Sequence, residues 1–248
     1  MAATTVRLDQ WLVAHGYAET RTRARWLIER GQVWVRGQPC HKPSLTLADD
    51  CHVDIHGDGL PYVSRGGLKL ERALQTFGID VMGMVALDIG ASTGGFVDCL
   101  LQRGAQRVYA LDVGVGQLAP QLHKDARVVT LEGRNVRTFP AAELPEAVEL
   151  ITVDVSFISL RLVLPLLPPF LRPRGGVVAL VKPQFEVGVE HVGRGGIVRD
   201  PHHRELALQR VMSVAEGAGF RVLQSAAATG SWADGNQETF IDLSWAAE

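Results

Sequence analysis

The stretch VALDIGASTGGFVDCLL, residues 85–101, has the pattern of a glycine-rich loop between a buried strand and a helix. Apolar residues surround Asp88, and residues 95–101 have the composition of a helix start. Glycines at positions 90, 94 and 95 allow a tight turn and the close approach of a ligand, because glycine carries no Cβ. We therefore expect this loop to bind a ligand.

Two common phosphate-binding loops do not fit this segment. A P-loop needs a Lys after its last glycine, and Phe96 stands there instead. The fingerprint G-x-G-x-x-G of dinucleotide sites is not matched, because Ala91 and Ser92 follow Gly90. Asp88 at the strand end would repel phosphate and suits a ligand that carries an amine. The loop resembles the cofactor loop D/E-x-G-x-x-x-G of class I S-adenosylmethionine-dependent methyltransferases; a strand–turn–helix without a ligand is the alternative.

A second acid favours adenosine binding. The segment RVYALDVG, residues 107–114, indicates another buried strand, and Asp112 near its end follows Asp88 by 24 positions. Nucleotide-binding α/β folds place an acid about 20 residues beyond the glycine loop, where it binds ribose hydroxyls. We expect S-adenosylmethionine as the cofactor, and the resemblance assigns these residues to its site: Asp88, Gly90, Ala91, Ser92, Thr93, Gly94 and Asp112.

Composition sets limits on the other classes of function. The 248 residues, 46% of them hydrophobic, suffice for one large domain or for a medium and a small one. Cys40, Cys51 and Cys99 lack the spacing of a disulfide framework or a zinc site, so no metal is expected. No apolar run reaches the length of a membrane span, and the N-terminus lacks the apolar core of a signal peptide. We expect a cytoplasmic protein that does not contact membranes.

Charge is concentrated at the N-terminus. The first 44 residues carry seven basic and three acidic side chains, whereas the whole chain has a net charge of −2. Helices are expected at 8–15 and, after a cap at Thr20, at 20–30, followed by strands at 32–37 and 51–55. The layout RLDQWL…TRTRARWLIERGQVWVRGQ resembles the S-four-type RNA-binding module, with Arg36 in place of the usual Asn. The resemblance implies arginines on RNA phosphates, namely Arg7, Arg21, Arg23, Arg25 and Arg30; a solvated arginine face is the alternative.

Strands and helices alternate from residue 85 onward, which is typical of a parallel, doubly wound sheet. The last segment, ETFIDLSW, fits the reversed strand that ends class I methyltransferases. We expect an α/β fold, a class I (Rossmann-like) S-adenosylmethionine-dependent methyltransferase, with a small N-terminal α+β S-four-type RNA-binding domain. The expected bounds are 1–58 for the RNA-binding domain, 59–64 for a linker rich in Gly and Pro, and 65–248 for the methyltransferase domain. Residues 65–67 are either turn residues before a helix at 69–77 or part of a site.

Charged residues end two expected strands of the methyltransferase domain, VELITVD at 148–154 and GGVVALVK at 175–182, at the edge where such sheets bind ligands. Asp154 follows ITV, and Lys182 follows VVALV, where an unpaired buried lysine would be costly. Lysine can act as a base when desolvation and nearby cations lower its pKa; a lysine that only reaches toward solvent is the alternative. The N/D-P-P-Y/F motif of base-nitrogen methylation is replaced by D-V-S-F. Methylation of a cytosine carbon needs a nucleophilic cysteine, often in a Pro-Cys pair, and the pair at residues 39 and 40 lies in the expected RNA-binding domain. A hydroxyl acceptor remains the best interpretation.

The order of motifs resembles the TlyA/haemolysin A family over nearly the whole chain. These motifs are the RNA-binding head, YVSRGGLKL, DIGASTGGF, LDVG, TVDVSFISL, LVKPQFE, GRGGIVRD and G-x-x-E near the end. The resemblance implies 2′-O-methylation of ribose in ribosomal RNA, on cytidine, by FtsJ-like enzymes with a Lys-Asp-Lys-Glu tetrad. By position the tetrad is Lys69, Asp154, Lys182 and Glu238. Lys182 would be the base, Asp154 would orient it and face the cofactor's sulfonium, and Lys69 and Glu238 would position the substrate.

The same resemblance implies the remaining contacts. A loop at 193–200 would cover the site, with Arg194 and Arg199 on phosphates, and Arg65 is also assigned to RNA. The expected partner is ribosomal RNA or a ribosomal subunit, with no obligatory protein partner. Two alternatives stay open: a membrane-lytic haemolysin, and a non-catalytic ribosome-assembly factor that keeps the methyltransferase fold.

Overall fold

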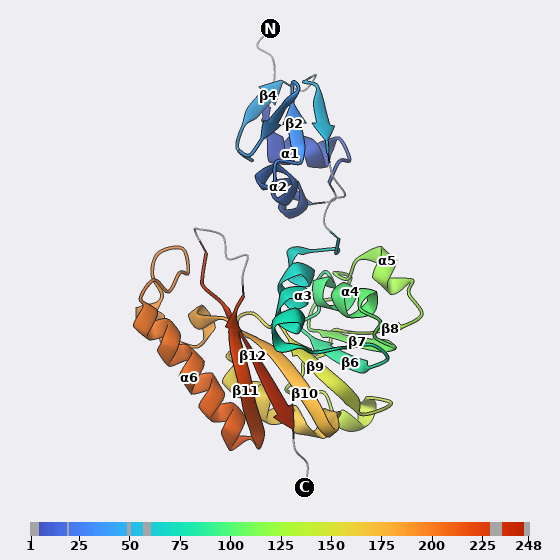
Figure 1. Cartoon of the computed structure of the whole chain (residues 1–248), viewed down its shortest axis with the longest axis vertical. Coiled ribbons are helices and arrows are strands. Elements are labelled where there is room, and N and C mark those ends of the chain that lie inside the picture. The colour runs from blue at the N-terminus through green and yellow to red at the C-terminus, as the bar shows by residue number, and fades with distance from the viewer. Residues whose placement is uncertain (1–4, 19, 49–50, 57–60, 229–234, 246–248) are drawn as a thin grey trace. The chain divides into compact units, whose positions relative to one another are not determined.

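The computed structural model of the chain describes residues 5–18, 20–48, 51–56, 61–228 and 235–245. These residues form two compact units, Met1–Ser64 and Arg65–Glu248 (Figure 1). Residues 57 and 58 of the expected RNA-binding domain, and 59 and 60 of the expected linker, lie outside the described residues.

The first unit packs two helices with two small antiparallel sheets, in which β1 pairs with β4 and β2 lies between β3 and β5. Its second helix begins where the sequence predicts, because Thr20 Oγ1 accepts the Arg23 N–H at 3.2 Å. Arg36 turns the chain between β2 and β3 with φ 53°, a left-handed conformation that Asn adopts more readily than Arg. The elements are β1 (Thr5–Arg7), α1 (Leu8–Ala14), α2 (Arg21–Glu29), β2 (Val33–Val35), β3 (Gln38–Cys40), β4 (Thr46–Ala48) and β5 (Val53–Ile55).

The second unit is built on a seven-stranded sheet in the order β11-β12-β10-β9-β6-β7-β8. Six of the seven strands run in one direction, and five of them, β10, β9, β6, β7 and β8, are parallel neighbours. Strand β12 is antiparallel to both of its neighbours, as expected for a reversed last strand. The strands are β6 (Val85–Ile89), β7 (Arg107–Asp112), β8 (Val128–Glu132), β9 (Val148–Val153), β10 (Leu171–Val181), β11 (Phe220–Ala227) and β12 (Thr239–Trp245). The helices are α3 (Arg65–Phe77), α4 (Gly95–Gln102), α5 (Pro120–His123) and α6 (Pro201–Gly217).

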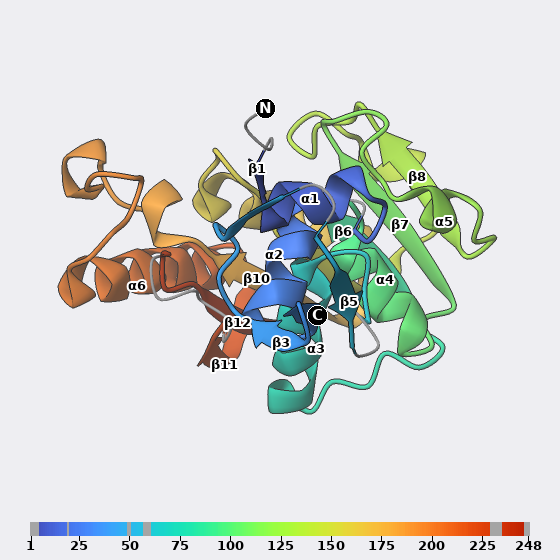
Figure 2. The ribbon, with the colours of Figure 1, turned by 90° about the horizontal axis from the view of Figure 1, so that it is seen from above.

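The two faces of this sheet are covered by different helices. In Figures 1 and 2, α6 lies beside β11, whereas α4 lies beside α3. Odd-numbered side chains such as Leu87 and Ile151 share a core with Val211 of α6. On the even-numbered face the Phe240 ring of β12 lies 6.0 Å from the Phe96 ring of α4. Even-numbered residues of the central strands therefore face α3 and α4.

Two local features differ from the expectation. The helix expected at 69–77 begins at Arg65, so the Gly66-Gly67 pair belongs to its first turn rather than to a preceding turn. The connection from β9 to β10 is a series of 3-10 turns, because prolines at 165, 168 and 169 lack the N–H that an α-helix needs. The 3-10 turns of the unit are η1 (Ala141–Glu143), η2 (Leu160–Leu162), η3 (Leu164–Leu166), η4 (Pro168–Phe170), η5 (Pro183–Phe185) and η6 (Val189–His191).

Candidate active site

The register of the sheet brings the expected site residues to one edge. Ile89 of β6 pairs with Leu111 of β7 and Val153 of β9. The next residues of these three strands, in the same order, are Gly90, Asp112 and Asp154. On the other side of β9, Val181 of β10 pairs with Thr239 of β12, so that Lys182 and Glu238 come next. All of these positions are even-numbered and continue the face that α3 and α4 cover.

Four charged side chains of this edge form two ion pairs. Lys182 Nζ lies 2.5 Å from Asp154 Oδ1 and donates a hydrogen bond to Ser156 Oγ at 2.9 Å. Lys69 Nζ, from α3, donates to Glu238 Oε2 at 2.5 Å. The Lys182 side chain is 12% exposed and that of Glu238 15%, so each pair is largely withdrawn from water. The four expected tetrad residues are therefore present as two lysine–carboxylate pairs.

Asp112 fixes the glycine loop. Its Oδ2 accepts the Ser92 N–H at 2.8 Å, and its Oδ1 accepts the Gly114 N–H at 2.7 Å. Gly90 has φ 87°, and a Cβ at this position would lie 2.5 Å from the carbonyl oxygen of Asp154. Only glycine fits there, and this close approach brings the loop against the residue that pairs with Lys182.

A cavity of about 580 Å³ opens along this loop. Gly90, Ser92, Asp112 and Asp154 line it, together with apolar residues such as Val113. Its volume lies within the range of roughly 300–1,000 Å³ usual for small-molecule sites. Each Asp112 carboxylate oxygen keeps acceptor capacity beyond its backbone contact, which suits a pair of ribose hydroxyls. The cavity thus fits an adenosyl group, with Asp154 at the end nearest Lys182.

Asp88 lies beneath the loop and is not among the residues that line the cavity. Its side chain is fully buried, and Oδ1 accepts the Thr152 hydroxyl at 2.6 Å. Oδ2 has no hydrogen-bond partner among the described residues. Burial raises the pKa of Asp88 to about 7; the Thr152 hydrogen bond opposes this, and the charges of Asp154 and Asp112 add to it. A buried carboxyl with a free oxygen either keeps a proton or receives a donor, so its assignment to the cofactor stays a prediction.

The remaining loop residues assigned to the cofactor are Ala91, Thr93 and Gly94, and they lie away from the wall of the large cavity. Gly94 is the N-cap of α4 with φ 92°, and its N–H donates to the Ala91 carbonyl at 2.7 Å. The Thr93 carbonyl accepts the Ala119 N–H at 3.2 Å. In this structure these three residues shape the turn, and their contact with a cofactor stays a prediction.

An aromatic ring at the cavity was not foreseen from the sequence. Phe157 lines the cavity, is 93% exposed, and has φ 64°, a left-handed conformation that is rare for a bulky residue. Its ring lies 5.3 Å from that of Phe185. An aromatic residue in TVDVSFISL has the same sequence signature whether it is buried or exposed, so only the structure places this ring at the site.

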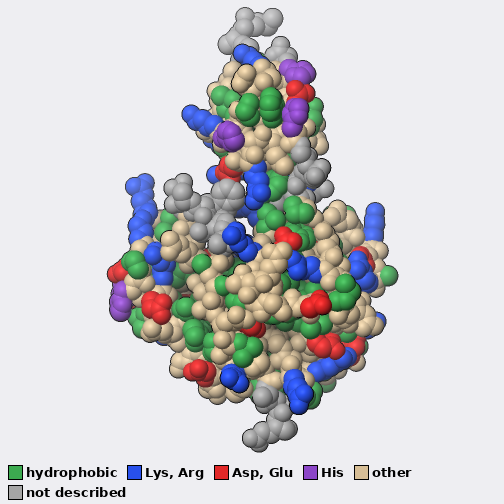
Figure 3. All heavy atoms as spheres, in the orientation of Figure 1, with side chains coloured by type: hydrophobic (Ala, Val, Ile, Leu, Met, Phe, Trp, Pro, Cys, Tyr) green, Lys and Arg blue, Asp and Glu red, His purple; other side chains and the backbone are tan. Residues whose placement is uncertain are grey.

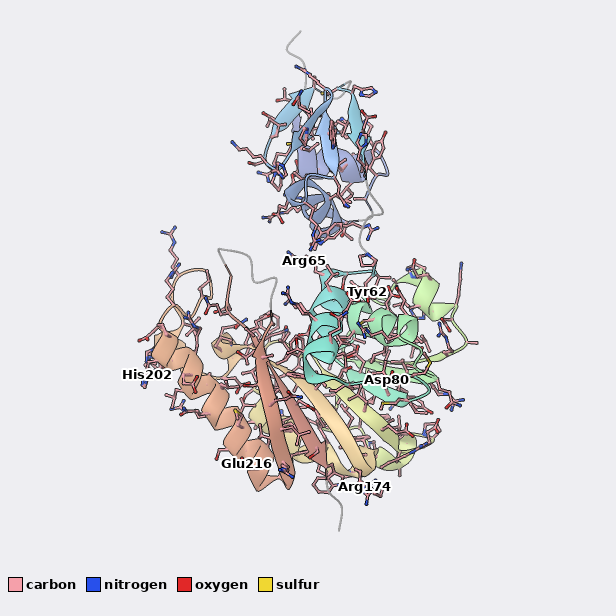
Figure 4. The ribbon with its side chains drawn as sticks, viewed as in Figure 1. Tyr62, Arg65, Asp80, Arg174, His202 and Glu216 are labelled. Atoms are coloured by element: carbon pink, nitrogen blue, oxygen red, sulfur yellow. The ribbon has the colours of Figure 1, made fainter. Side chains whose placement is uncertain are left out.

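The expected loop at 193–200 is tied to the segment that leads to Glu238. Asn236 Oδ1 accepts the Val198 N–H at 2.8 Å, and its Nδ2 donates to the Gly196 carbonyl at 2.7 Å. Arg194 and Arg199 are exposed on this loop. Arg65, the third arginine assigned to RNA in this unit, is the first residue of α3 (Figure 4). Asn236 is a second site residue that sequence patterns did not single out.

In the first unit, a buried acid braces two of the arginines assigned to RNA. Asp9 is fully buried and accepts hydrogen bonds from Arg7 Nε at 3.0 Å and Arg21 Nη2 at 2.9 Å. Burial would raise the pKa of Asp9, but the two arginines lower it to about 2. Arg25 pairs with Glu29 at 3.6 Å, and Arg30 lies over the Trp26 ring at 5.0 Å. The arginine side chains of Arg7 and Arg21 stay 41% and 56% exposed, so both can still meet a partner.

Basic side chains of both units reach the surface. On the face shown in Figure 3, Lys and Arg side chains are spread over each unit rather than gathered in one patch. Within the described part of the chain, no helix has the length and apolar character needed to cross a membrane.

Comparison with known proteins identifies the family. Residues 62–244 match the FtsJ-like methyltransferase model, and residues 6–49 match the S4 domain model. YqxC of Bacillus subtilis, a candidate rRNA methyltransferase, is 45% identical over 251 residues, which cover 100% of this chain and 89% of that protein. TlyA of Mycobacterium tuberculosis, a 16S/23S rRNA (cytidine-2′-O)-methyltransferase, is 42% identical over 242 residues, or 97% of this chain and 90% of that protein.

A solved structure agrees with these matches. A candidate hemolysin from Streptococcus thermophilus has 40% sequence identity and a TM-score of 0.77, covering 100% of this chain and 90% of that one. The expected class I methyltransferase fold with an N-terminal RNA-binding domain is thereby confirmed. S-adenosylmethionine is the cofactor, in keeping with the cavity beside Asp112. The chain belongs to the FtsJ-like methyltransferases, carries an S4 domain at residues 6–49, and is similar to YqxC and TlyA over 97% or more of its length.

Proposed function

We propose that this protein transfers a methyl group from S-adenosylmethionine to the ribose 2′-hydroxyl of a cytidine in ribosomal RNA. The observation that carries the proposal is the Lys182–Asp154 pair, 2.5 Å apart, with Asp154 on the wall of the cofactor cavity. A 2′-hydroxyl must lose its proton as its oxygen is methylated, and a lysine beside the cavity is placed to take it. The choice of a cytidine ribose in ribosomal RNA as the methyl acceptor is based on the activity named for TlyA, which is 42% identical over 97% of this chain.

In this mechanism each pair has its own task. Bound S-adenosylmethionine supplies a methyl group on a positively charged sulfur. Lys182 Nζ would accept the 2′-hydroxyl proton while the 2′-oxygen takes up the methyl group, and the neutral thioether of the spent cofactor would leave. Asp154 and Ser156 orient the amine, and the Asp154 carboxylate stabilises the lysine cation that forms. Lys69 of α3 and Glu238, the residue before β12, position the ribose. Asp112 holds the ribose of the cofactor.

RNA would be bound by both units. The proposed contacts to phosphate are Arg7, Arg21, Arg23, Arg25 and Arg30 in the domain at 1–58, and Arg65, Arg194 and Arg199 in the domain at 65–248, with a linker at 59–64. Such contacts hold the RNA without reading its sequence. The proposed partner is a ribosomal subunit, and the proposed compartment is the cytoplasm. Support comes from the S4 domain match and from the exposure of five of these arginines, Arg21, Arg25, Arg30, Arg194 and Arg199.

Two measurements test the function. Ribose methylation of 16S and 23S rRNA is mapped by mass spectrometry in cells with and without the gene; loss of one or more 2′-O-methylcytidines is expected. Purified protein, isolated subunits lacking the modification and radiolabelled S-adenosylmethionine should restore the mark, and Lys182→Arg serves as the control variant. Identical maps with and without the gene refute the proposal. Dye leakage from liposomes at the same protein concentration would point to the membrane-lytic alternative instead.

A further inference from the structure

Glu186 is a buried carboxylate that the mechanism above does not use. Its exposed fraction is 2%. Oε1 accepts the Leu160 N–H at 2.7 Å, and Oε2 accepts the Ser159 hydroxyl at 2.5 Å. Arg161 Nε approaches the same Oε2 at 3.4 Å. Glu186 closely follows Lys182 in the chain, whereas its donors follow Asp154, so the carboxylate joins the two segments that leave the Lys182–Asp154 pair.

The same two segments are also joined at their other end. Lys182 contacts Asp154 at 2.5 Å and Ser156 at 2.9 Å. We call residues 154–160 the arch, because the contacts of Lys182 hold its first part and those of Glu186 hold its end. The apex of the arch is Phe157, and the arch residues 154–158 line the cofactor cavity.

The backbone of the arch is strained at its apex. Phe157 has φ 64°, and a bulky residue in this left-handed region costs energy that the surroundings must offset. Such a conformation persists only where contacts on both sides determine it. Ser156 is held by Lys182 on one side of Phe157, and Ser159 and Leu160 are held by Glu186 on the other. Without the second anchor, the arch can relax and Ser156 can leave Lys182.

We propose that Glu186 is a positioning residue that holds the arch against Lys182 and thereby sets the Lys182–Asp154 pair for proton transfer. This inference rests on the proposed function, because the pair has a reaction to perform only there. Glu186 acts through Ser159 and Leu160, and it lies outside the cavity lining. Burial raises the pKa of this carboxyl, and its three donors oppose that effect only in part.

Three variants separate positioning from simple stability. Glu186→Leu removes every acceptor, Glu186→Gln keeps one acceptor for the Leu160 N–H, and Ser159→Ala removes one donor. Asp242→Asn is the matched control: Asp242 is another buried carboxylate, 6% exposed, and accepts the Gln224 amide at 3.0 Å on strand β12. Melting temperature, cofactor affinity, RNA affinity and single-turnover methylation are measured for each protein well below its melting temperature.

We expect Glu186→Leu to lose about 10- to 100-fold in single-turnover rate with saturating cofactor and subunit, because small displacements at a reacting group have effects of this size. Glu186→Gln should fall between Glu186→Leu and the wild type, and RNA affinity should be unchanged. Asp242→Asn should lower the melting temperature and leave the rate within about twofold. Amide hydrogen exchange at residues 156–160 should be faster in Glu186→Leu than in Asp242→Asn.

The outcomes distinguish the two proposals. Unchanged exchange at 156–160, or a Glu186→Leu rate within about twofold of the wild type, overturns the positioning role. Rate losses that follow the melting temperature equally in Glu186→Gln and Asp242→Asn also overturn it. A wild-type protein that methylates no ribosomal subunit refutes the proposed function, while the exchange measurement still decides whether Glu186 anchors the arch. If Glu186→Leu does not fold, Glu186→Gln and Ser159→Ala give the same comparison.

Discussion

Lys182 Nζ and Asp154 Oδ1 lie 2.5 Å apart at the ends of two neighbouring parallel strands, β10 and β9. The sheet itself creates this contact, since both residues leave the same edge and point to the same face. An opposite charge stabilises the protonated lysine, whereas a base must be uncharged when it accepts a proton. If Lys182 is the base, Asp154 orients its amine and stabilises the cation that forms when the amine accepts the proton.

Substitution of Lys182 tests whether it carries the proton. Lys182→Arg keeps the positive charge but cannot release a proton near neutral pH, so single-turnover methylation should fall by about 100-fold or more. Lys182→Ala should be no worse than Lys182→Arg, and both should bind cofactor and RNA as the wild type does. An active Lys182→Arg protein would show that the residue only holds charge, and Asp154 would be tested next as the base.

Asp112 should matter for the cofactor in two ways, because it can hold the ribose and also fixes the loop through the Ser92 and Gly114 N–H groups. Asp112→Ala should weaken S-adenosylmethionine binding by about tenfold or more, equivalent to the loss of roughly 1.5–3 kcal/mol. Calorimetry on the purified protein measures this. Asp125→Ala, which removes an acid paired with Arg127 at the surface, is the control and should bind normally. Equal affinities for the two variants would remove Asp112 from the site.

Several parts of the site could be predicted from the sequence because they are local. The glycine loop, the acid at 112 and the charged strand ends at 154 and 182 are visible as residue types that follow apolar runs. A parallel sheet then places such strand ends on one edge. The cap at Thr20 follows from an equally local pattern, whereas the reversed last strand is expected from the resemblance to class I methyltransferases.

The remaining features depend on tertiary contacts. The division of the tetrad into Lys182–Asp154 and Lys69–Glu238 is set by the approach of α3 to β12, and no spacing in the sequence encodes it. The burial of Asp88 below the loop and its hydrogen bond from Thr152 of the neighbouring strand arise only in the folded sheet. The exposure of Phe157 depends on contacts at both ends of the arch, and these involve residues distant in the sequence.

Asp88 should make stability depend on pH. Its pKa is about 7 in the folded protein, against the ordinary value of 3.8, so between these values the folded state binds more protons than the unfolded state. The free energy of unfolding should therefore fall as pH rises from about 4 to 7, by at most about 1.4 kcal/mol per pH unit. Asp88→Asn keeps an acceptor for the Thr152 hydroxyl and should flatten this dependence. Urea unfolding at several pH values measures it, and an equal slope in the variant would contradict the assignment.

The N-terminal domain should bind RNA through arginines that do not pair with the buried Asp9. Replacing Arg23 and Arg25 with Gln should weaken binding to ribosomal RNA fragments and reduce the salt slope by up to about two, since fewer counterions are released. Cofactor affinity should stay the same. Arg21 is left intact because it pairs with the buried Asp9. Unchanged affinity and slope, measured over a range of salt concentrations, would show that this helix is not an RNA anchor.

Asn236 should link the loop at 193–200 to the catalytic edge. Its side chain bonds the Val198 N–H and the Gly196 carbonyl, and the loop carries the exposed Arg194 and Arg199. Asn236→Ala removes both bonds, which together contribute about 1–3 kcal/mol to holding the loop. We expect weaker binding of ribosomal subunits and a lower methylation rate, with cofactor affinity preserved.

The neighbouring position supplies the control for this last prediction. Gln237→Ala changes an exposed amide next in the chain, so it should bind subunits and methylate at the wild-type level. Asn236→Asp is the sharper variant, because its carboxylate still accepts the Val198 N–H but faces the Gly196 carbonyl with a second acceptor. It should therefore resemble Asn236→Ala rather than the wild type. If Asn236→Asp and Gln237→Ala behave alike in subunit binding and single-turnover rate, the donor half of the clamp has no function, and the loop is held by other contacts such as Arg204 on the Val198 carbonyl.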